Sequence, residues 1–113
     1  MSLASKLVTP RKAAWRDVDA ALDHYEISAG EETARAFLAA IEGAFAHVSQ
    51  FPGSGSPRYA HALGLPDLRS WPLKRFPYLV FYLERDDHID VWRVLRMEQD
   101  IANEMGEGEA GAL

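Results

Sequence analysis

The sequence predicts an α+β fold in which a helical hairpin packs on a small, mostly antiparallel sheet. Two stretches in the first half repeat apolar residues at spacings of three and four, as one face of a helix requires. A segment rich in Pro, Gly and Ser follows, and after it come short apolar runs separated by turn residues, as in strands. With a short apolar run near the N-terminus, the predicted order is β-α-α-β-β-β.

The first half reads as one strand and two helices. Residues 6–8 form a candidate strand, and Thr9 and Pro10 have the residue types of a helix N-cap and first helical position. The first helix would end near Gly30, and the second would run over residues 31–50. Their apolar stripes would cover one face of the sheet: Ala14, Val18, Ala21, Leu22 and Tyr25, then Ala34, Phe37, Leu38, Ile41, Phe45 and Val48.

The second half reads as a loop and three strands. Residues 51–66 are rich in Pro and Gly and predict a loop. Residues 68–73 contain Pro72, which is tolerated at a sheet edge because it lacks an N–H. Residues 78–83 are apolar on both faces, as in a central strand, and residues 89–95 would return as their hairpin partner. The sheet face away from the helices is expected to stay partly open.

Length and composition predict a single domain over residues 1–113, with a core at about 6–101 and a disordered tail at 106–113. The chain has no Cys, which excludes disulfides, thiol chemistry and Cys-based zinc or iron–sulfur sites. No signal peptide is recognisable, and no run approaches the roughly 18 apolar residues of a membrane span. We therefore expect a cytoplasmic protein that does not contact membranes.

The net charge of −5 conceals an uneven distribution. Residues 98–113 carry five acidic and no basic residues, so the rest of the chain balances 12 acidic against 12 basic residues. The stretch 58–78 is basic, with Asp67 as its one acid. The global acidity argues against direct DNA binding, which depends on a basic field, but a local basic surface can hold an acidic partner.

Seven residues are candidates for binding a target or partner: Arg58, Arg69, Trp71, Lys74, Arg75, Arg93 and Arg96. By strand alternation Arg93 would share a face with Ile89, Val91 and Leu95. Arg69, Arg93 and Arg96 would then converge on the open sheet face and contact a carboxylate or phosphate. Alternatively, Arg93 pairs with an internal carboxylate such as Asp100 or Asp67, and Arg58, Lys74 and Arg75 are ordinary surface cations.

The residue types predict no catalytic residue, metal site or cofactor. Arginine stabilises charge but stays protonated, so it is a poor general base. The four histidines share no metal-ligand spacing, and Gly53-Ser54-Gly55 precedes no Lys-Ser or Lys-Thr pair, as a phosphate loop would. Trp71, beside Pro72 on the expected edge strand, is a candidate contact for an added strand or a docked helix.

The chain resembles the RelE/ParE superfamily of type II toxins, and within it the ParE or plasmid-stabilisation branch. The resemblance covers about residues 6–101. It rests on the order of Leu7-Val8-Thr9-Pro10, Phe51-Pro52 with Gly55 and Arg58, Leu68-Arg69-Ser70, Phe76-Pro77-Tyr78-Leu79-Val80-Phe81-Tyr82, Val91-Trp92-Arg93-Val94-Leu95 and Asp100-Ile101. The family often has Leu-His after the Arg-Val of the last strand, where this chain has Arg96, and the acidic tail makes this chain less basic than many toxins.

The resemblance implies a toxin that is neutralised by a ParD-like antitoxin in a hetero-oligomer and that inhibits DNA gyrase. Two alternatives are a RelE-like ribosome-dependent mRNA endonuclease, or a non-toxic relative that keeps only antitoxin binding. The ribonuclease branch usually has a C-terminal tyrosine, and no Tyr follows Tyr82 here.

Overall fold

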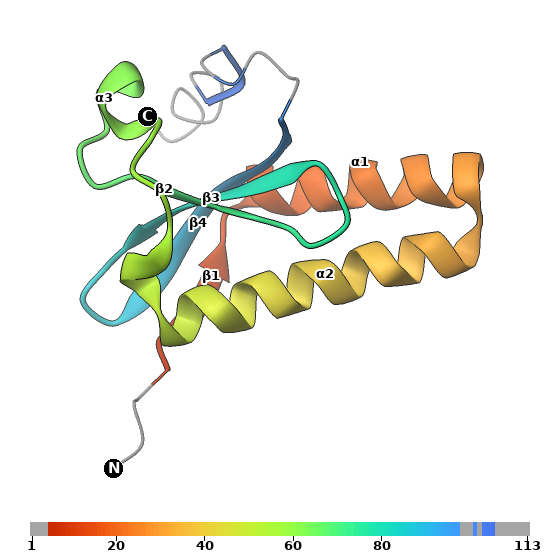
Figure 1. Cartoon of the computed structure of the whole chain (residues 1–113), viewed down its shortest axis with the longest axis horizontal. Coiled ribbons are helices and arrows are strands. Elements are labelled where there is room, and N and C mark those ends of the chain that lie inside the picture. Colours follow the sequence, from red (N-terminus) through yellow and green to blue (C-terminus); the bar gives the residue numbers. More distant parts are fainter. Residues whose placement is uncertain (1–4, 98–100, 102, 106–113) are drawn as a thin grey trace.

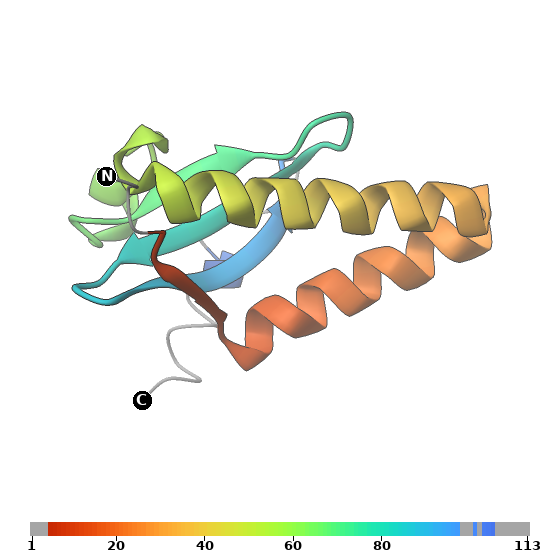
Figure 2. The same cartoon turned by 90° about the horizontal axis from the view of Figure 1, so that it is seen from below.

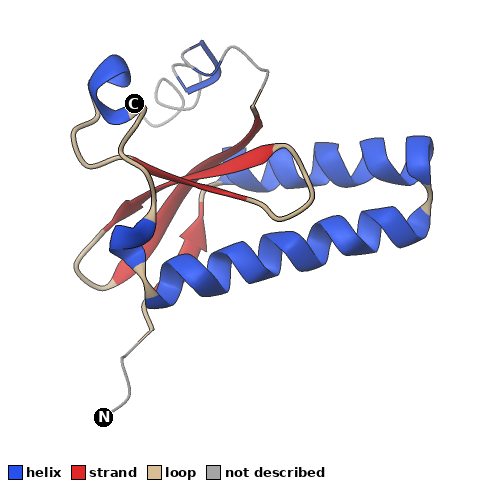
Figure 3. Cartoon of the chain, viewed as in Figure 1, coloured by secondary structure: helices blue, strands red, loops and turns tan. Residues whose placement is uncertain are grey.

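The computed structural model describes residues 5–97, 101 and 103–105. It confirms the predicted fold class, with one strand, two long helices and then three strands (Figures 1 and 3). The elements are β1 (Leu7–Pro10), α1 (Lys12–Ala29), α2 (Glu31–Gln50), the 3-10 turn η1 (Pro52–Ser54), α3 (Ala60–Leu63), β2 (Arg69–Pro72), β3 (Tyr78–Glu84) and β4 (His88–Arg96).

The first helix begins later than predicted, because Thr9 and Pro10 belong to β1. They pair with Asp90 and Val91 of β4, which keeps their backbone extended, and the helix starts at Lys12. The prediction that Thr9 caps this helix was therefore wrong. The break between the helices is as expected: Gly30 has a φ of 97°, which favours glycine, and its N–H donates to the carbonyl of Glu26 at 3.2 Å.

The sheet has the order β1-β4-β3-β2. β1 lies parallel to β4, while β3 pairs antiparallel with both β4 and β2. The apolar strands β3 and β4 are thus central, and β2, which contains Pro72, is an edge strand as predicted.

A β-bulge in β4 changes which face its side chains occupy. Phe81 pairs with Arg93 and Tyr82 pairs with Val91, so Trp92 is an extra residue in the ladder. As a result Val91 and Val94 both pack on the helical side, while Trp92 and Leu95 pack on the other. The prediction that Arg93 shares a face with Ile89, Val91 and Leu95 was wrong for Ile89 and Val91, because simple alternation does not continue through a bulge. It holds for Leu95, since Arg93 and Leu95 pair with Phe81 and Leu79 on the same face of β3.

The helical hairpin covers one face of the sheet, and Figure 2 shows the two long helices alongside it. Most of the predicted stripe residues are buried or packed on this core, although Leu38 remains 38% exposed. Tyr25 of α1 contacts Phe37 of α2 and Phe76 and Tyr78 of the sheet side, with ring centroids 5.1–6.3 Å apart. These aromatic contacts tie the hairpin to the sheet.

The second face of the sheet is covered, and the prediction that it stays partly open was wrong. The segment expected to be only a loop contains η1 and α3, and α3 packs on this face together with the helical residues Ile101 and Met105. Burial of apolar side chains from both central strands explains the covering. The buried cluster comprises Ala60, Leu68, Leu79, Phe81, Leu83, Trp92, Leu95, Ile101 and Met105.

The predicted disordered tail, residues 106–113, lies outside the described residues. Within the described residues, no helix combines the length and the apolar character needed to cross a membrane.

Candidate protein-binding site

Arg93 is buried inside the protein and takes no part in an exposed cationic surface. Its Nε and Nη2 atoms each lie 2.7 Å from a different carboxylate oxygen of Asp17, and its Nη1 donates to the carbonyl of Glu104 at 2.6 Å. The hydrogen bonds to Asp17 raise the pKa of Arg93, against the opposite effect of burial. The internal ion pair that the sequence left open is therefore present, with Asp17 and Glu104 as the partners. The predicted partner Asp67 lies instead at the hollow beside Arg69, and Asp100 lies outside the described residues.

Arg69 stabilises a loop, together with Tyr82. Its Nη1 donates to the carbonyl of Gly55 at 2.7 Å, while the Tyr82 hydroxyl donates to the carbonyl of Pro52 at 2.6 Å and accepts the N–H of Gly55 at 3.1 Å. Burial raises the pKa of the Tyr82 hydroxyl, although the Gly55 contact and the charge of Arg69 oppose this. With its proton retained and its oxygen engaged, Tyr82 is unsuited to act as a base.

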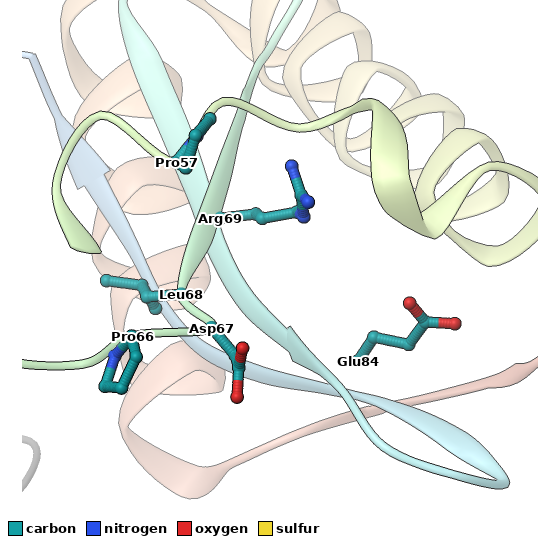
Figure 4. A pocket seen from close by; sticks show the side chains of 6 residues that line it. All are labelled: Pro57, Pro66, Asp67, Leu68, Arg69 and Glu84. Atoms are coloured by element: carbon teal, nitrogen blue, oxygen red, sulfur yellow. The ribbon is translucent and has the colours of Figure 1, made fainter.

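A polar hollow of about 180 Å³ lies beside Arg69, and Figure 4 shows Asp67 and Glu84 around the same opening. Glu84 also forms an ion pair with Nζ of Lys6 at 2.8 Å. Two carboxylates at the opening repel a phosphate group, which offsets the attraction of the single guanidinium. This hollow is therefore a poor site for the backbone of RNA.

The other predicted cations lie on the surface, in two places. Arg58 follows η1 and lies over the ring of Tyr59, with Cζ 5.3 Å from its centroid. Lys74 and Arg75 lie in the β2–β3 loop, and Arg96 pairs with Tyr78 at the same end of the sheet. Arg69 pairs with Tyr82 of β3, which is four residues along the strand from Tyr78, the partner of Arg96. Four residues correspond to about 13 Å of strand. The predicted convergence of Arg69, Arg93 and Arg96 was therefore wrong.

Arg75 has an uncommon backbone conformation. Its φ is 72°, in the left-handed region, and no other described non-glycine residue has a positive φ. An L-residue in this region costs roughly 1–2 kcal/mol relative to the ordinary conformation. Such strain occurs often at functional sites, where the surrounding structure supports it. Here the flanking bond from the Leu73 N–H to the carbonyl of Tyr78 closes the loop at 3.0 Å.

Trp71 lies at the edge of the sheet and forms one wall of a trough. The opposite wall is α2, and the trough holds about 230 Å³. Its lining residues are Ala39, Ala40, Gly43, Ala44, His47, Trp71, Pro72 and Lys74. Trp71 and Lys74 were among the candidates from the sequence; the α2 residues were not. The one signal that could have identified them is Gly43, a helix-disfavouring residue in the middle of a strongly predicted helix.

A second ionic network, around Asp90, was also missed. Its carboxylate accepts hydrogen bonds from Arg11, Arg85 and the Trp92 indole at 2.9–3.2 Å. Burial would raise the pKa of Asp90, but the bonds from the two arginines outweigh it and hold the pKa below its ordinary value. The guanidinium of Arg11 also stacks 4.0 Å from the Trp92 ring centroid. This network fixes the end of β1 to β4 and engages two further cations internally.

The described residues hold no group of three or more His, Cys, Asp or Glu side chains that could bind a metal ion. What they offer a ligand is a trough with an aromatic wall and one exposed cation, Lys74, in its lining. Such an arrangement is suited to a macromolecular surface and contains no paired acid and base.

Comparison with known proteins gives a family and a similar structure. Residues 8–101 match the family described as the ParE toxin of the type II toxin–antitoxin system, parDE. A solved structure titled as a chromosomal ParDE toxin–antitoxin system from P. aeruginosa is similar, with a TM-score of 0.70 and 26% sequence identity. The similarity covers 86% of this chain and 100% of that one. No curated protein sequence matches.

Proposed function

The chain belongs to the ParE toxin family of type II toxin–antitoxin systems, and we propose that a ParD-like antitoxin neutralises it and that its free form inhibits DNA gyrase. The antitoxin partner is supported by the similar solved structure, whose title names a ParDE system. Both partners would be held through protein surfaces in hetero-oligomers. Stabilisation of a plasmid stays a prediction, since the similar structure is of a chromosomal system.

One observation carries the preference for binding over RNA cleavage: the buried or half-buried groups that resemble a cleavage site are engaged in the fold. Arg93 is paired with Asp17, and Arg69 is bonded to the carbonyl of Gly55. Tyr82 has a raised pKa, and its hydroxyl is hydrogen-bonded on both sides. An RNA-cleaving site needs a proton acceptor and a proton donor next to cations that can contact the phosphate. The two guanidinium groups and the Tyr82 hydroxyl are held by hydrogen bonds within the fold, so these three residues provide no such set.

The target surface is proposed from the exposed cations Arg58, Lys74, Arg75 and Arg96 and from the half-buried Trp71. Cations on a protein of net charge −5 favour an acidic protein partner over extended nucleic acid, because nucleic acid binding requires a broad positive field. Arg69 and Arg93 act indirectly in this proposal, since they hold the sheet and the loop in place.

The first experiment is expression in cells, with and without the small open reading frame next to the gene. The toxin alone should stop growth, and the neighbouring frame should restore growth and co-purify with it. Normal growth with co-purification would identify a non-toxic relative that retains only antitoxin binding. Normal growth without any co-purifying partner would contradict the proposal.

The second experiment separates gyrase inhibition from translation. Purified toxin should inhibit supercoiling by DNA gyrase and leave ribosome-bound mRNA intact. Unaffected supercoiling together with cleavage of ribosome-bound mRNA would replace the proposal by the RelE-like alternative.

A further inference from the structure

We propose that the exposed face of α1 binds a second copy of this chain, with the two α1 helices antiparallel about a two-fold axis near Asp19. This surface, the α1 face, consists of Lys12, Trp15, Arg16, Asp19, Leu22, Asp23 and Glu26. It shares no residue with the trough between α2 and β2. The proposal concerns the free chain and does not depend on an antitoxin or on gyrase.

The α1 face is one continuous strip along the helix. Its residues recur at spacings of three and four, which places them within about a third of the helix circumference. Ala14, Val18 and Ala21 lie on the opposite side and are buried in the core between the hairpin and the sheet. The end of the hairpin at Gly30 projects beyond the sheet (Figures 1 and 2), so the strip is open along the helix.

The apolar part of the α1 face contains an exposed tryptophan that is held by a neighbouring ring. Trp15 is 47% exposed, and its ring meets the Phe45 ring of α2 edge to face, with centroids 6.4 Å apart. Leu22 lies two turns further along α1 and is half-buried. Tryptophan is a frequent anchor of protein interfaces, and a side chain fixed before binding loses little rotamer freedom in the complex.

The charges on the α1 face run against the helix dipole. Acidic residues stabilise the N-terminal end of a helix, and basic residues stabilise the C-terminal end. α1 instead begins with Lys12 and has Glu26 near its end, with no acid in its first turn and no base in its last. α2 has the favourable order, with Glu31 and Glu32 in its first turn and His47 in its last. The order on α1 therefore brings no benefit to the isolated helix.

The charged side chains of the α1 face are also unpaired. Among the described residues, the ion pairs of the chain include one residue of α1, Asp17, which points inward to Arg93. All five charged residues of the α1 face are exposed. Their charges are thus available to a partner whose charges have the opposite order along the helix.

An antiparallel copy of the same helix has that opposite order. Three pairs of residues are symmetric about a point at or next to Asp19: Lys12 with Glu26, Arg16 with Asp23, and Trp15 with Leu22. A two-fold axis at this point brings each member of a pair to the other member on the second copy, so every contact occurs twice. Lys12 and Glu26 are about 21 Å apart along the helix, so the contacts extend over most of α1. Asp19 is the exception, because its two copies lie near the axis and repel each other.

The test measures the monomer–dimer equilibrium of the purified full-length chain by sedimentation equilibrium. Trp15→Ala should weaken the dimer at least tenfold, because an aromatic anchor is lost from both copies. Phe51→Ala is the matched control: Phe51 is 49% exposed and lies outside α1, so its loss should leave the dimer unchanged. A wild-type chain that stays monomeric up to about 1 mM would overturn the proposal.

The antiparallel arrangement is tested by exchanging charges. Lys12→Glu and Glu26→Lys should each weaken the dimer about fivefold, because each places like charges together at two contacts. Each should also raise the melting temperature of the dilute monomer by about 2 °C, because the new charge suits the helix dipole. The double variant Lys12→Glu/Glu26→Lys should return the dimer to within about twofold of wild type. Lys74→Glu makes the same charge change outside α1 and should leave the dimer unchanged.

Asp19→Asn should act in the opposite direction and strengthen the dimer about threefold, because it removes the repulsion at the axis. A dimer that is unaffected by Trp15→Ala and by Lys12→Glu would overturn the α1 face as the contact surface. A double charge variant no better than the single variants would overturn the antiparallel arrangement. Loss of antitoxin binding in Trp15→Ala, in a chain that does not dimerise, would assign this face to the antitoxin instead.

Discussion

Asp17 on α1 and Arg93 on β4 form a two-point ion pair, and the same carboxylate of Asp17 accepts the backbone N–H of Val94 at 2.9 Å. β1 pairs with β4 only from His88 to Val91, so the rest of this strand edge has no neighbouring strand. Asp17 accepts a hydrogen bond from one outward-facing N–H group of this edge, that of Val94. Arg93 in turn donates a hydrogen bond to the carbonyl of Glu104. One carboxylate thus joins the first helix, the sheet edge and the C-terminal helical residues.

The first prediction follows from this pair. Arg93→Ala should lower the free energy of unfolding by about 3–5 kcal/mol, because it leaves the largely buried Asp17 carboxylate without its partner. Urea denaturation measures the change. Arg35→Ala is the control: Arg35 pairs with Glu31 at the surface, with both side chains at least 70% exposed, and its loss should cost about 0.5 kcal/mol or less. Equal effects in both variants would contradict the structural role of Arg93.

The second prediction concerns the close packing at Gly55. A Cβ atom there would lie 3.0 Å from Cβ of Arg69 and 3.0 Å from Cε1 of Tyr82, and it would also clash with the Tyr82 hydroxyl. Gly55→Ala should therefore destabilise the protein by about 1–3 kcal/mol in urea denaturation. Gly53→Ala changes the same loop at a position with nothing within 4 Å, and its stability should stay within about 0.5 kcal/mol of wild type.

The third prediction is a pH dependence from Asp90. Its pKa is lowered in the folded chain, so the unfolded chain binds the proton more readily. The stability from Asp90 is present above the ordinary carboxyl pKa of 3.8 and is lost as the pH falls through the lower, folded value. The urea concentration at the midpoint of unfolding should decrease as the pH is lowered from 6. In Asp90→Asn this decrease should be smaller. A midpoint profile identical in the variant would show that other carboxylates determine the acid response.

The fourth prediction uses the strained loop. Arg75→Gly should raise the free energy of unfolding by about 0.5–1 kcal/mol, because glycine adopts a φ of 72° without strain. The gain is smaller than the full strain energy, because glycine has more conformational freedom in the unfolded chain. Lys74→Gly, at the neighbouring residue without a positive φ, should give no such gain. Thermal denaturation compares them. A loss of stability in Arg75→Gly would show that the Arg75 side chain, beyond its charge, supports the loop.

Local patterns were enough to predict the two long helices, the four strands and their order, whereas η1 and α3 were predicted only as loop. The second helix runs over residues 31–50, as its apolar period indicated, and Pro72 identified an edge strand. These features depend on the backbone preferences of neighbouring residues, which a short window of sequence contains. The start of the first helix was misplaced because pairing of Thr9 and Pro10 with β4 overrode their capping preference.

The candidate site was predicted only in part, and the reason is distance along the chain. Lys74, Arg75 and Trp71 were identified from composition and from their neighbours, whereas the partner of Arg93 lies 76 residues away. Strand alternation misplaced Arg93 because a bulge at Trp92 shifts the register.

The sequence by itself determined an α+β fold, a basic stretch after the loop and the absence of cysteine chemistry. Only the tertiary structure decided which cations remain available, since ion pairing depends on contacts between residues far apart in sequence. It also decided that the second sheet face is covered and that a trough lies between α2 and β2. These features arise from packing of separate elements, and no local pattern specifies them.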